Sequence, residues 1–493
     1  MEQNNIQTLS KETDIRRAKI EELKNQGINP YAEKFERTHK IIEARNLEMG
    51  TKVKLCGRMT SRRIMGKFLF ANIEDVEAKI QISMSFNDLG EEQYKFFKQY
   101  VDLADFIGVE GELYATQTGE ITVKCYSFKL LSKALNPLPE KWHGLTDVES
   151  KYRQRYLDLV TNPETREVFL GRFKLMNFIR RYLGENGFIE VETPILQTAV
   201  CGASAKPFLT HHNALDMECN LRIAPEVYLK QIIAGGFDRV FEIAKCFRNE
   251  GMDASHLQEF TQVEWYASYW NFEDNIKFFT NFLQNLLMEV KGTLQLEKDG
   301  KILDFSGEFK RINYTETVNS VLGFNVLEET DVSAFKQKLI EKGFKEDEVS
   351  PIKTVGGLID LVYKRKIRPD IVQPTILFNY PASIVPLARV NDNDNRLIDM
   401  FQVLVNGEEI CKAYSELVDP IIQRKKLEEQ ALAKADGDEE AMDLDEGFIL
   451  AMEHGMPPIS GLGMGIDRLM MMLFNQPTIR DIILFPQMKP ESK

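Results

Sequence analysis

The stretch Gly461-Leu-Gly-Met-Gly-Ile-Asp-Arg468 lies near the C-terminus, directly before the apolar run Leu469 to Phe474. The pattern predicts a glycine-rich strand end that leads into a helix and places one guanidinium at its start. Glycines allow backbone to approach a ligand without a Cβ in the way, and a guanidinium offers phosphate oxygens a planar, permanently charged fork. The stretch is therefore a candidate polyphosphate site, although glycines before a helix often serve tight packing only.

A second polar segment lies upstream and predicts a β-hairpin. Phe247-Arg-Asn-Glu250 is followed by a loop-like stretch, Gly251 to Gln258, and then by the alternating apolar residues of Glu259 to Tyr266. Nucleotidyl transfer needs mainly positive groups around the phosphates, so Arg248 on the first strand and His256 in the loop could clamp ATP. Taken singly, Arg248 could instead pair with Glu250, and His256 could be a solvated loop residue.

The hairpin and the glycine-rich stretch resemble motifs 2 and 3 of the class II aminoacyl-tRNA synthetases. Phe188 to Thr198, which contains Pro194, resembles motif 1, and the three occur in the family's order. Further segments make the chain similar to the lysyl-tRNA synthetases of this class: YRQRYLD (152–158), GASAKPF (202–208), THHN (210–213), RIAPE (222–226) and SEL (415–417). The resemblance covers the chain from about residue 14 to residue 490.

This resemblance implies ATP-dependent activation of L-lysine to lysyl-adenylate, followed by transfer to the 3′ end of tRNA(Lys). No protein nucleophile is needed. The implied catalytic residues are Arg248, Glu250 and Arg468; Arg248 would bridge the substrate carboxylate and the α-phosphate. The implied ATP-binding residues are Arg248, Glu250, His256, Phe260, Glu409, Gly465 and Arg468, with Phe260 stacked on adenine. Glu409 is also the implied ligand for Mg²⁺, which neutralises polyphosphate charge.

The implied lysine-binding residues are Gly202, Glu226, Arg248, Glu264, Tyr266, Tyr414 and Glu416. A lysine ammonium is strongly hydrated, so its pocket must replace the lost water with carboxylates and hydroxyls. Three acids together favour a cation. Singly, each glutamate could be a surface charge or half of a structural ion pair, and Tyr266 could be a core ring.

Four positions depart from the family pattern. Ser255 stands where an arginine is usual, which puts one phosphate contact in doubt. Gln402 replaces a second metal-binding glutamate, so a site that usually holds up to three magnesium ions is expected to bind fewer of them or to bind them more weakly. Lys412 replaces an asparagine near the substrate carboxylate, and Cys201 replaces a glycine before Gly202. A divergent but active enzyme is the favoured interpretation.

Composition limits the range of partners and compartments. The formal net charge is -13, which argues against general coating of DNA or RNA, because nonspecific binding depends on clustered cations. One local cluster without acids consists of Lys52, Lys54, Arg58, Arg62, Arg63 and Lys67. The 6 cysteines are scattered without Cys-x-x-Cys spacing. No signal peptide or membrane-spanning stretch is apparent, and we expect a soluble, cytoplasmic protein.

The chain is expected to contain several modules. Residues 1–50 form an N-terminal extension with a short amphipathic helix, 13–26. Residues 51–135 contain five short apolar runs, 53–59, 68–73, 80–84, 106–114 and 121–131, with a helix near Phe96, and predict an OB-fold barrel. Residues 136–150 are a linker punctuated by prolines. Residues 151–493 form the catalytic domain, with helices 164–184 and 272–291 against an antiparallel sheet, and the fold class is α+β.

By resemblance, Arg58, Phe70, Gln81 and Glu120 of the barrel contact the anticodon of tRNA(Lys), and Phe70 would stack on a base. Phe70 could almost equally well be a buried residue of the barrel core. Motif 1 implies a homodimer with Pro194 at its seam.

Two other functions remain open at this stage. One is a paralogue that transfers lysine or an analogue to an acceptor other than tRNA. The other is an inactive tRNA-binding regulator.

Overall fold

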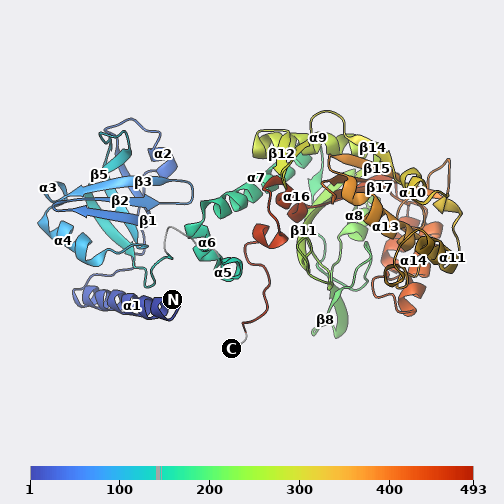
Figure 1. Cartoon of the computed structure of the whole chain (residues 1–493), viewed down its shortest axis with the longest axis horizontal. Helices are drawn as coiled ribbons and strands as arrows, with labels where there is room; N and C mark the ends of the chain where they lie inside the picture. The colour runs from blue at the N-terminus through green and yellow to red at the C-terminus, as the bar shows by residue number, and fades with distance from the viewer. Residues whose placement is uncertain (1, 140–144, 146, 492–493) are drawn as a thin grey trace. The chain divides into compact units, whose positions relative to one another are not determined.

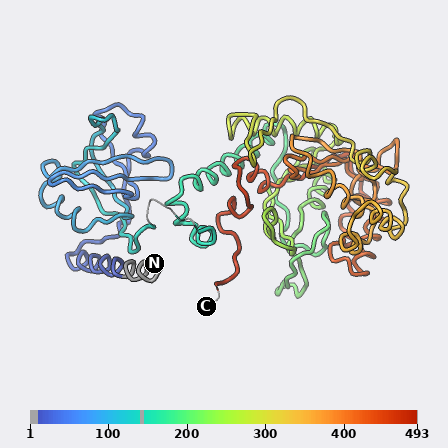
Figure 2. Tube along the Cα trace, in the orientation of Figure 1, coloured from blue at the N-terminus to red at the C-terminus, as the bar shows by residue number. Residues whose placement is uncertain are grey.

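A computed structural model describes residues 2–139, 145 and 147–491 of the chain. It divides into two compact units after Arg166, traced in Figures 1 and 2. Part of the expected linker, residues 140–144 and 146, lies outside the described residues. The four expected domain bounds stay predictions.

The first unit contains a closed five-stranded barrel with strand order β1-β2-β3-β5-β4. Its strands are β1 (Lys52–Met65), β2 (Phe68–Glu74), β3 (Lys79–Ser85), β4 (Phe106–Ala115) and β5 (Ile121–Ser132). Its helices are α1 (Glu2–Asn25), α2 (Ile41–Ala44), α3 (Phe86–Leu89), α4 (Glu91–Tyr100), α5 (Val148–Arg153) and α6 (Arg155–Thr161). All five expected strands and the helix near Phe96 are therefore present.

A buried ion cluster ties α1 to the barrel. The Lys133 ammonium is fully buried against Asp102 and lies 2.8 Å from Asp105. Lys19 of α1 lies 2.6 Å from Asp102. Since removal of one partner would leave a buried charge unpaired, the cluster fixes the helix to the barrel.

The second unit is built on an eight-stranded sheet with order β14-β15-β16-β17-β18-β11-β10-β6. These strands are β6 (Ile189–Glu190), β10 (Arg239–Phe247), β11 (Glu259–Ser268), β14 (Lys310–Asn313), β15 (Thr375–Pro381), β16 (Leu397–Val405), β17 (Glu408–Ser415) and β18 (Ile459–Gly465). Most neighbours pair antiparallel, as expected.

Alternate residues of the central strands face two different cores. Trp265, Phe401 and Met464 pack against helices α7 (Pro163–Glu185), α9 (Phe272–Lys291) and α16 (Ile466–Leu473). Met400 and Tyr414 face the other side, toward a second core. That core contains α8 (Glu226–Ala234), α10 (Tyr314–Leu322), α11 (Val332–Glu341), α13 (Val355–Lys366), α14 (Pro420–Ala435) and α15 (Glu446–Glu453). The cavity described below lies on this second side.

Two local expectations need correction. The motif 1 segment is two short strands in different sheets, β6 and β7 (Leu196–Gln197), separated by Pro194; proline has no N–H for the ladder. The C-terminal helix begins at Ile466, three residues before its apolar run.

Strand β7 joins β9 (Met217–Leu221) and β8 (Phe208–His212), and β12 (Gln295–Lys298) pairs with β13 (Lys301–Asp304). Within the described residues no helix is long and apolar enough to cross a membrane.

Candidate active site

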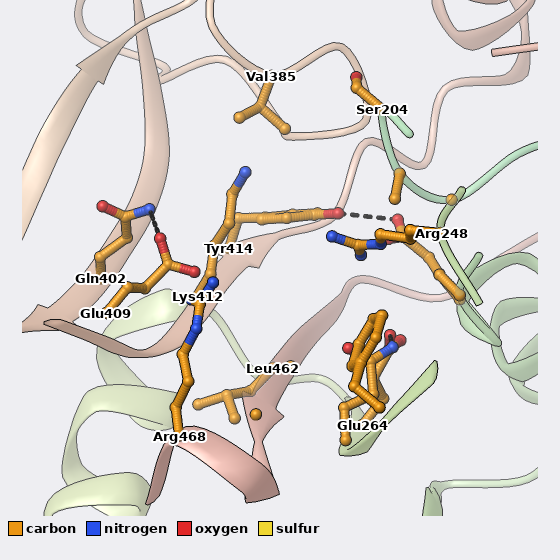
Figure 3. Close-up of a pocket in the computed structure, with 18 of the residues that line it drawn as sticks. Ser204, Arg248, Glu264, Val385, Gln402, Glu409, Lys412, Tyr414, Leu462 and Arg468 are labelled. Atoms are coloured by element: carbon orange, nitrogen blue, oxygen red, sulfur yellow. Dashed lines mark hydrogen bonds between the residues drawn. The ribbon is translucent and has the colours of Figure 1, made fainter. Parts of the chain in front are cut away.

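A cavity of about 530 Å³ opens beside β11, β17 and β18 of the second unit (Figure 3). It brings together every residue expected to bind ATP or lysine. These lining residues are Gly202, Glu226, Arg248, Glu250, His256, Phe260, Glu264, Tyr266, Glu409, Tyr414, Glu416, Gly465 and Arg468. Positions more than two hundred residues apart in the sequence therefore converge on one site.

Arg248 lies one residue beyond the end of β10, not on the strand as expected. Its backbone N–H donates to the carbonyl of Gln258, 2.8 Å away, which closes the hairpin loop. The guanidinium lies over the Phe260 ring, 5.0 Å from its centroid. Its buried Nε has no hydrogen-bond partner among the described residues, and no ion pair to Glu250 forms there. The guanidinium is thus positioned by a ring and keeps donors available for a ligand.

His256 and Arg468 meet at the mouth of the cavity. Arg468 Nη2 lies 2.7 Å from His256 Nε2, and His256 Nδ1 lies 2.8 Å from Asp253. Nε2 accepts from Arg468 in this arrangement, so a phosphate oxygen would have to replace that contact before His256 could donate to it. The start of α16 is anchored because Asp467 accepts hydrogen bonds of 2.7 Å from the backbone N–H of Thr261 and from Arg172.

The opposite end of the cavity is buried and acidic. Glu226, Glu264 and Glu416 are 5%, 6% and 2% exposed. The Tyr414 hydroxyl donates to Glu226 over 2.8 Å, and the Tyr266 hydroxyl donates to Glu264 over 3.0 Å. Glu226 is the first residue of α8, where the helix dipole favours a negative charge.

Burial perturbs two of these acids strongly. It raises the pKa of Glu264 to about 8, and the charge of Glu226 acts in the same direction. It also raises the pKa of Glu416 to about 8, although the nearby Lys230 ammonium opposes the shift. Both carboxyls therefore take up protons near neutral pH, and a bound cation would displace those protons.

Sequence reasoning missed Lys230. Its ammonium is fully buried, 2.6 Å from Glu226 and 2.5 Å from Glu416. Its position four residues after Glu226 on one helix was the available signal, because residues at that spacing are neighbours.

Glycine is required at position 461 by the acids beside it. A Cβ there would lie 2.2 Å from the Tyr266 ring and 2.5 Å from Glu416. Gly202 adopts φ of +95°, and its Cβ would lie 3.1 Å from that of Glu226. These two glycines therefore make room for the side chains of the acidic end.

A second polar group stands beside Arg468. Gln402 donates through Nε2 to Glu409 over 2.6 Å and accepts from the Tyr380 hydroxyl over 2.7 Å. Lys412 is the cross-strand partner of Gln402 and has no ion pair in the described part of the chain. Figure 3 shows Gln402, Glu409, Lys412 and Arg468 on one side of the cavity.

Sequence reasoning also missed the wall formed by α13 and the residues after it. Asp360, Lys364 and Arg368 line the cavity there. Lys364 pairs with Asp360 over 2.7 Å, and Arg368 pairs with Glu408 over 3.1 Å. No motif marks this segment, so its approach to the site depends on the fold alone.

The chain matches two family models. The model described as tRNA synthetases class II (D, K and N) matches residues 147–489, and that described as OB-fold nucleic acid binding domain matches residues 53–131. The lysine–tRNA ligase of Aquifex aeolicus (strain VF5) is 46% identical, over 94% of this chain and 77% of its own. That of Bacillus subtilis (strain 168) is 42% identical over 99% of both chains. That of Pelotomaculum thermopropionicum is 45% identical over 97% of this chain and 94% of its own.

The chain belongs to the lysine–tRNA ligase family. It is therefore an aminoacyl-tRNA synthetase of class II, with an OB-fold barrel before the catalytic sheet.

The barrel of this synthetase brings together three of the four expected anticodon residues. Phe70 is partly exposed, while Leu69 and Ala71 on either side are buried, so its ring lies on the outer face and not in the core. Gln81 and Glu120 lie on or beside the next two strands in the sheet. Arg58 is opposite Glu74, four residues along β2 from Phe70, and the cross-strand partner of Phe70 is Arg63.

Proposed function

We propose that the protein activates L-lysine with ATP to lysyl-adenylate and transfers the lysyl group to the 3′ end of tRNA(Lys). The observation that carries this proposal is the buried cluster of Glu226, Glu264 and Glu416 in a cavity that Arg248 and Arg468 also line. A site of this kind suits a substrate with a protonated amine at one end and a carboxylate that must meet a phosphate at the other.

The reaction requires no protein nucleophile. A lysine carboxylate oxygen bonds to the α-phosphorus, the bond from that phosphorus to the bridging oxygen breaks, and pyrophosphate leaves with its electron pair. Arg248 would contact both the carboxylate and the α-phosphate. Orientation of this kind is worth roughly 7 to 11 kcal/mol in favourable cases.

The remaining ATP contacts follow from the same arrangement. Adenine would stack on the face of Phe260 that Arg248 leaves open. Glu250 would accept a hydrogen bond from the adenine amino group. Gly465 has no side chain and would leave room for the nucleotide next to the backbone. His256 and Arg468 would bind the outer phosphates.

Glu409 fits one Mg²⁺ that is shared with the phosphates, because Mg²⁺ commonly uses one or two carboxylates together with phosphate oxygens. The described residues contain no group of three His, Cys, Asp or Glu side chains that could bind a metal alone. Bound there, Mg²⁺ would neutralise phosphate charge. Lys412 supplies a positive charge at the same place.

The lysine substrate would place its ammonium against Glu226 and Glu416 and its α-amino group near Gly202. Glu264, Tyr266 and Tyr414 complete the pocket. Both carboxylate oxygens of Glu416 are buried and have no hydrogen-bond partner among the described residues, which is the state expected of an acceptor group awaiting a donor.

We further propose a homodimer through motif 1. Ile189, Ile195, Leu196 and Leu209 on and around β6, β7 and β8 are large, apolar and exposed, as is typical of an interaction surface. A sizing measurement would test this: a monomeric mass at micromolar concentration would contradict it. A cytoplasmic location is consistent with six free cysteines.

The test of the main proposal is exchange of labelled pyrophosphate into ATP with each of the twenty amino acids, followed by charging of unfractionated tRNA. We expect exchange with lysine above all others, and lysine-specific charging. Exchange without charging would favour a different acceptor, and absence of exchange would favour the inactive regulator.

A further inference from the structure

We propose that Lys230 is a positioning residue, which holds the carboxyl groups of Glu226 and Glu416 in place and favours their ionised form, so that they can receive the ammonium of the substrate. This inference rests on the proposed function and adds to it a residue that does not itself contact the reacting atoms.

The geometry shows a lysine used as an internal counterion. One nitrogen contacts both carboxylates, Glu226 Oε1 at 2.6 Å and Glu416 Oε2 at 2.5 Å. The same nitrogen lies 5.6 Å from the ring of Tyr414 and 5.8 Å from that of Phe448. The Lys230 ammonium is thus enclosed by side chains from several elements of the fold.

The contacts leave one acceptor for the substrate. Oε2 of Glu416 forms an ion pair with Lys230 over 2.5 Å, whereas Oε1 of that residue has neither an ion pair nor a hydrogen bond within the described residues, and Glu416 lines the cavity. A fixed cation on one side of a carboxylate orients its other oxygen. Lys230 therefore aims Glu416 at the ligand.

Charge explains why such a cation is needed. Two carboxylates that share a buried site without a cation repel each other, and one of them takes up a proton. A protonated carboxyl is a poor partner for a substrate ammonium. The Lys230 ammonium reduces that repulsion, so Glu416 gives up its proton to a bound cation more readily than it would without Lys230.

The titration directions agree with this geometry. Burial by itself would lower the pKa of Lys230, but the charges of Glu226 and Glu416 outweigh burial and raise it above the ordinary value. Lys230 thus stays charged, and its charge lowers the pKa of Glu416 against the effect of burial. The charged groups that act on Lys230 are Glu226 and Glu416, with the Tyr414 ring beside it. Lys230 in turn acts on Cys201, which Asp445 also faces, and Glu264 and Tyr266 interact with Glu416.

The experiment measures the KM for lysine and kcat in pyrophosphate exchange at saturating ATP, from about pH 6.5 to about pH 9. With Lys230→Met, the acids lose their counterion, so KM should rise about tenfold or more near pH 7 and return toward the wild-type value near pH 9. kcat at saturating lysine should change much less. Lys230→Arg keeps the charge and should keep the wild-type pH midpoint, even if its larger head raises KM at every pH.

Lys133→Met is the matched control, because Lys133 is also a fully buried lysine between two acids. It should lower the melting temperature without moving the pH midpoint of KM. Titration of the substrate amino group is common to all variants and cancels in the comparison.

An unchanged midpoint in Lys230→Met, or an equal rise in KM at every pH, would show a merely structural role and overturn the inference. A shift in Lys230→Arg as large as that in Lys230→Met would do the same. If Lys230→Met does not fold, Lys230→Gln replaces it, and if neither folds the midpoint of Lys230→Arg decides. Failure of wild-type exchange with lysine would instead contradict the proposed function.

Discussion

The two ends of the cavity are built in different ways. At the ammonium end, Glu226, Glu416 and Lys230 are buried and already bonded to one another. At the phosphate end, His256 is about half exposed, and Arg248 keeps a buried nitrogen without a partner among the described residues. The selective end is therefore preorganised by the protein, whereas the phosphate end depends on the nucleotide to complete its contacts.

This contrast matches three of the four positions at which the sequence is expected to depart from the family pattern; the fourth, Cys201, is buried near Glu226 and Lys230 at the ammonium end. Ser255, Gln402 and Lys412 all line the cavity near its phosphate end. At the phosphate end, one cationic side chain can replace another, because phosphate oxygens accept hydrogen bonds from many directions. At the buried ammonium end such a replacement is not tolerated, since each polar group left unpaired there carries a full desolvation cost.

Replacement of the arginine at the reacting centre should have the largest effect. We expect Arg248→Ala to lower kcat for pyrophosphate exchange by on the order of 10³-fold or more, as for other arginines that stabilise phosphoryl transfer. Arg248→Lys should restore little, because an ammonium lacks the planar fork. Exchange within tenfold of wild type would show that the charge of Arg468 suffices at this end.

Removal of a charge from the ammonium end should come next. Glu416→Gln should weaken lysine use by roughly 2 to 5 kcal/mol in kcat/KM, because a buried ammonium loses its charged partner. Glu289→Gln is a suitable control, since Glu289 of α9 is exposed, pairs with Arg181 and does not line the cavity. An unchanged KM for lysine in Glu416→Gln would contradict the assignment of the pocket.

A smaller effect should appear on changing the pH. The pKa of Glu264 and that of Glu416 are raised to about 8 without ligand, so lysine binding near pH 7 should release protons and tighten as the pH rises toward 8. Calorimetry in buffers of different ionisation enthalpy would count the protons. Glu264→Gln removes one titrating group and should lower the count. Pocket affinity independent of pH would show that the acids are ionised before lysine arrives.

The same shifts have a consequence for stability. Folding raises the pKa of these carboxyls from 4.5 to about 8. Their contribution to the free energy of unfolding is therefore fully present below pH 4.5 and is lost as the pH rises through about 8. The melting temperature without lysine should therefore decline over this range, and saturating lysine should oppose the decline.

The sequence predicted the scaffold better than the cavity walls. The helix 272–291 and all five barrel strands follow from periodicity, because each has a local apolar pattern. Resemblance supplied the residues of the hairpin and of the glycine-rich strand. Lys364 and Arg368 reach the cavity from α13 and the turn after it, and no local pattern could reveal that, since their position depends on long-range packing.

The smallest expected effect tests whether the phosphate end has exchanged metal ligands for a protein cation. Gln402→Glu would place a second carboxylate beside Glu409, which now accepts a hydrogen bond from that amide. It should lower the Mg²⁺ concentration for half-maximal exchange by about tenfold or less, a range typical of changes around a metal ligand. Lys412→Asn removes the facing ammonium and should raise the requirement. The dependence of ATP affinity on Mg²⁺, measured with and without the ion, should shift in the same direction as the Mg²⁺ requirement for each variant. If neither variant moves the Mg²⁺ dependence, the strand pair that carries Gln402 and Lys412 does not tune the metal, and the phosphate end is as fixed as the ammonium end.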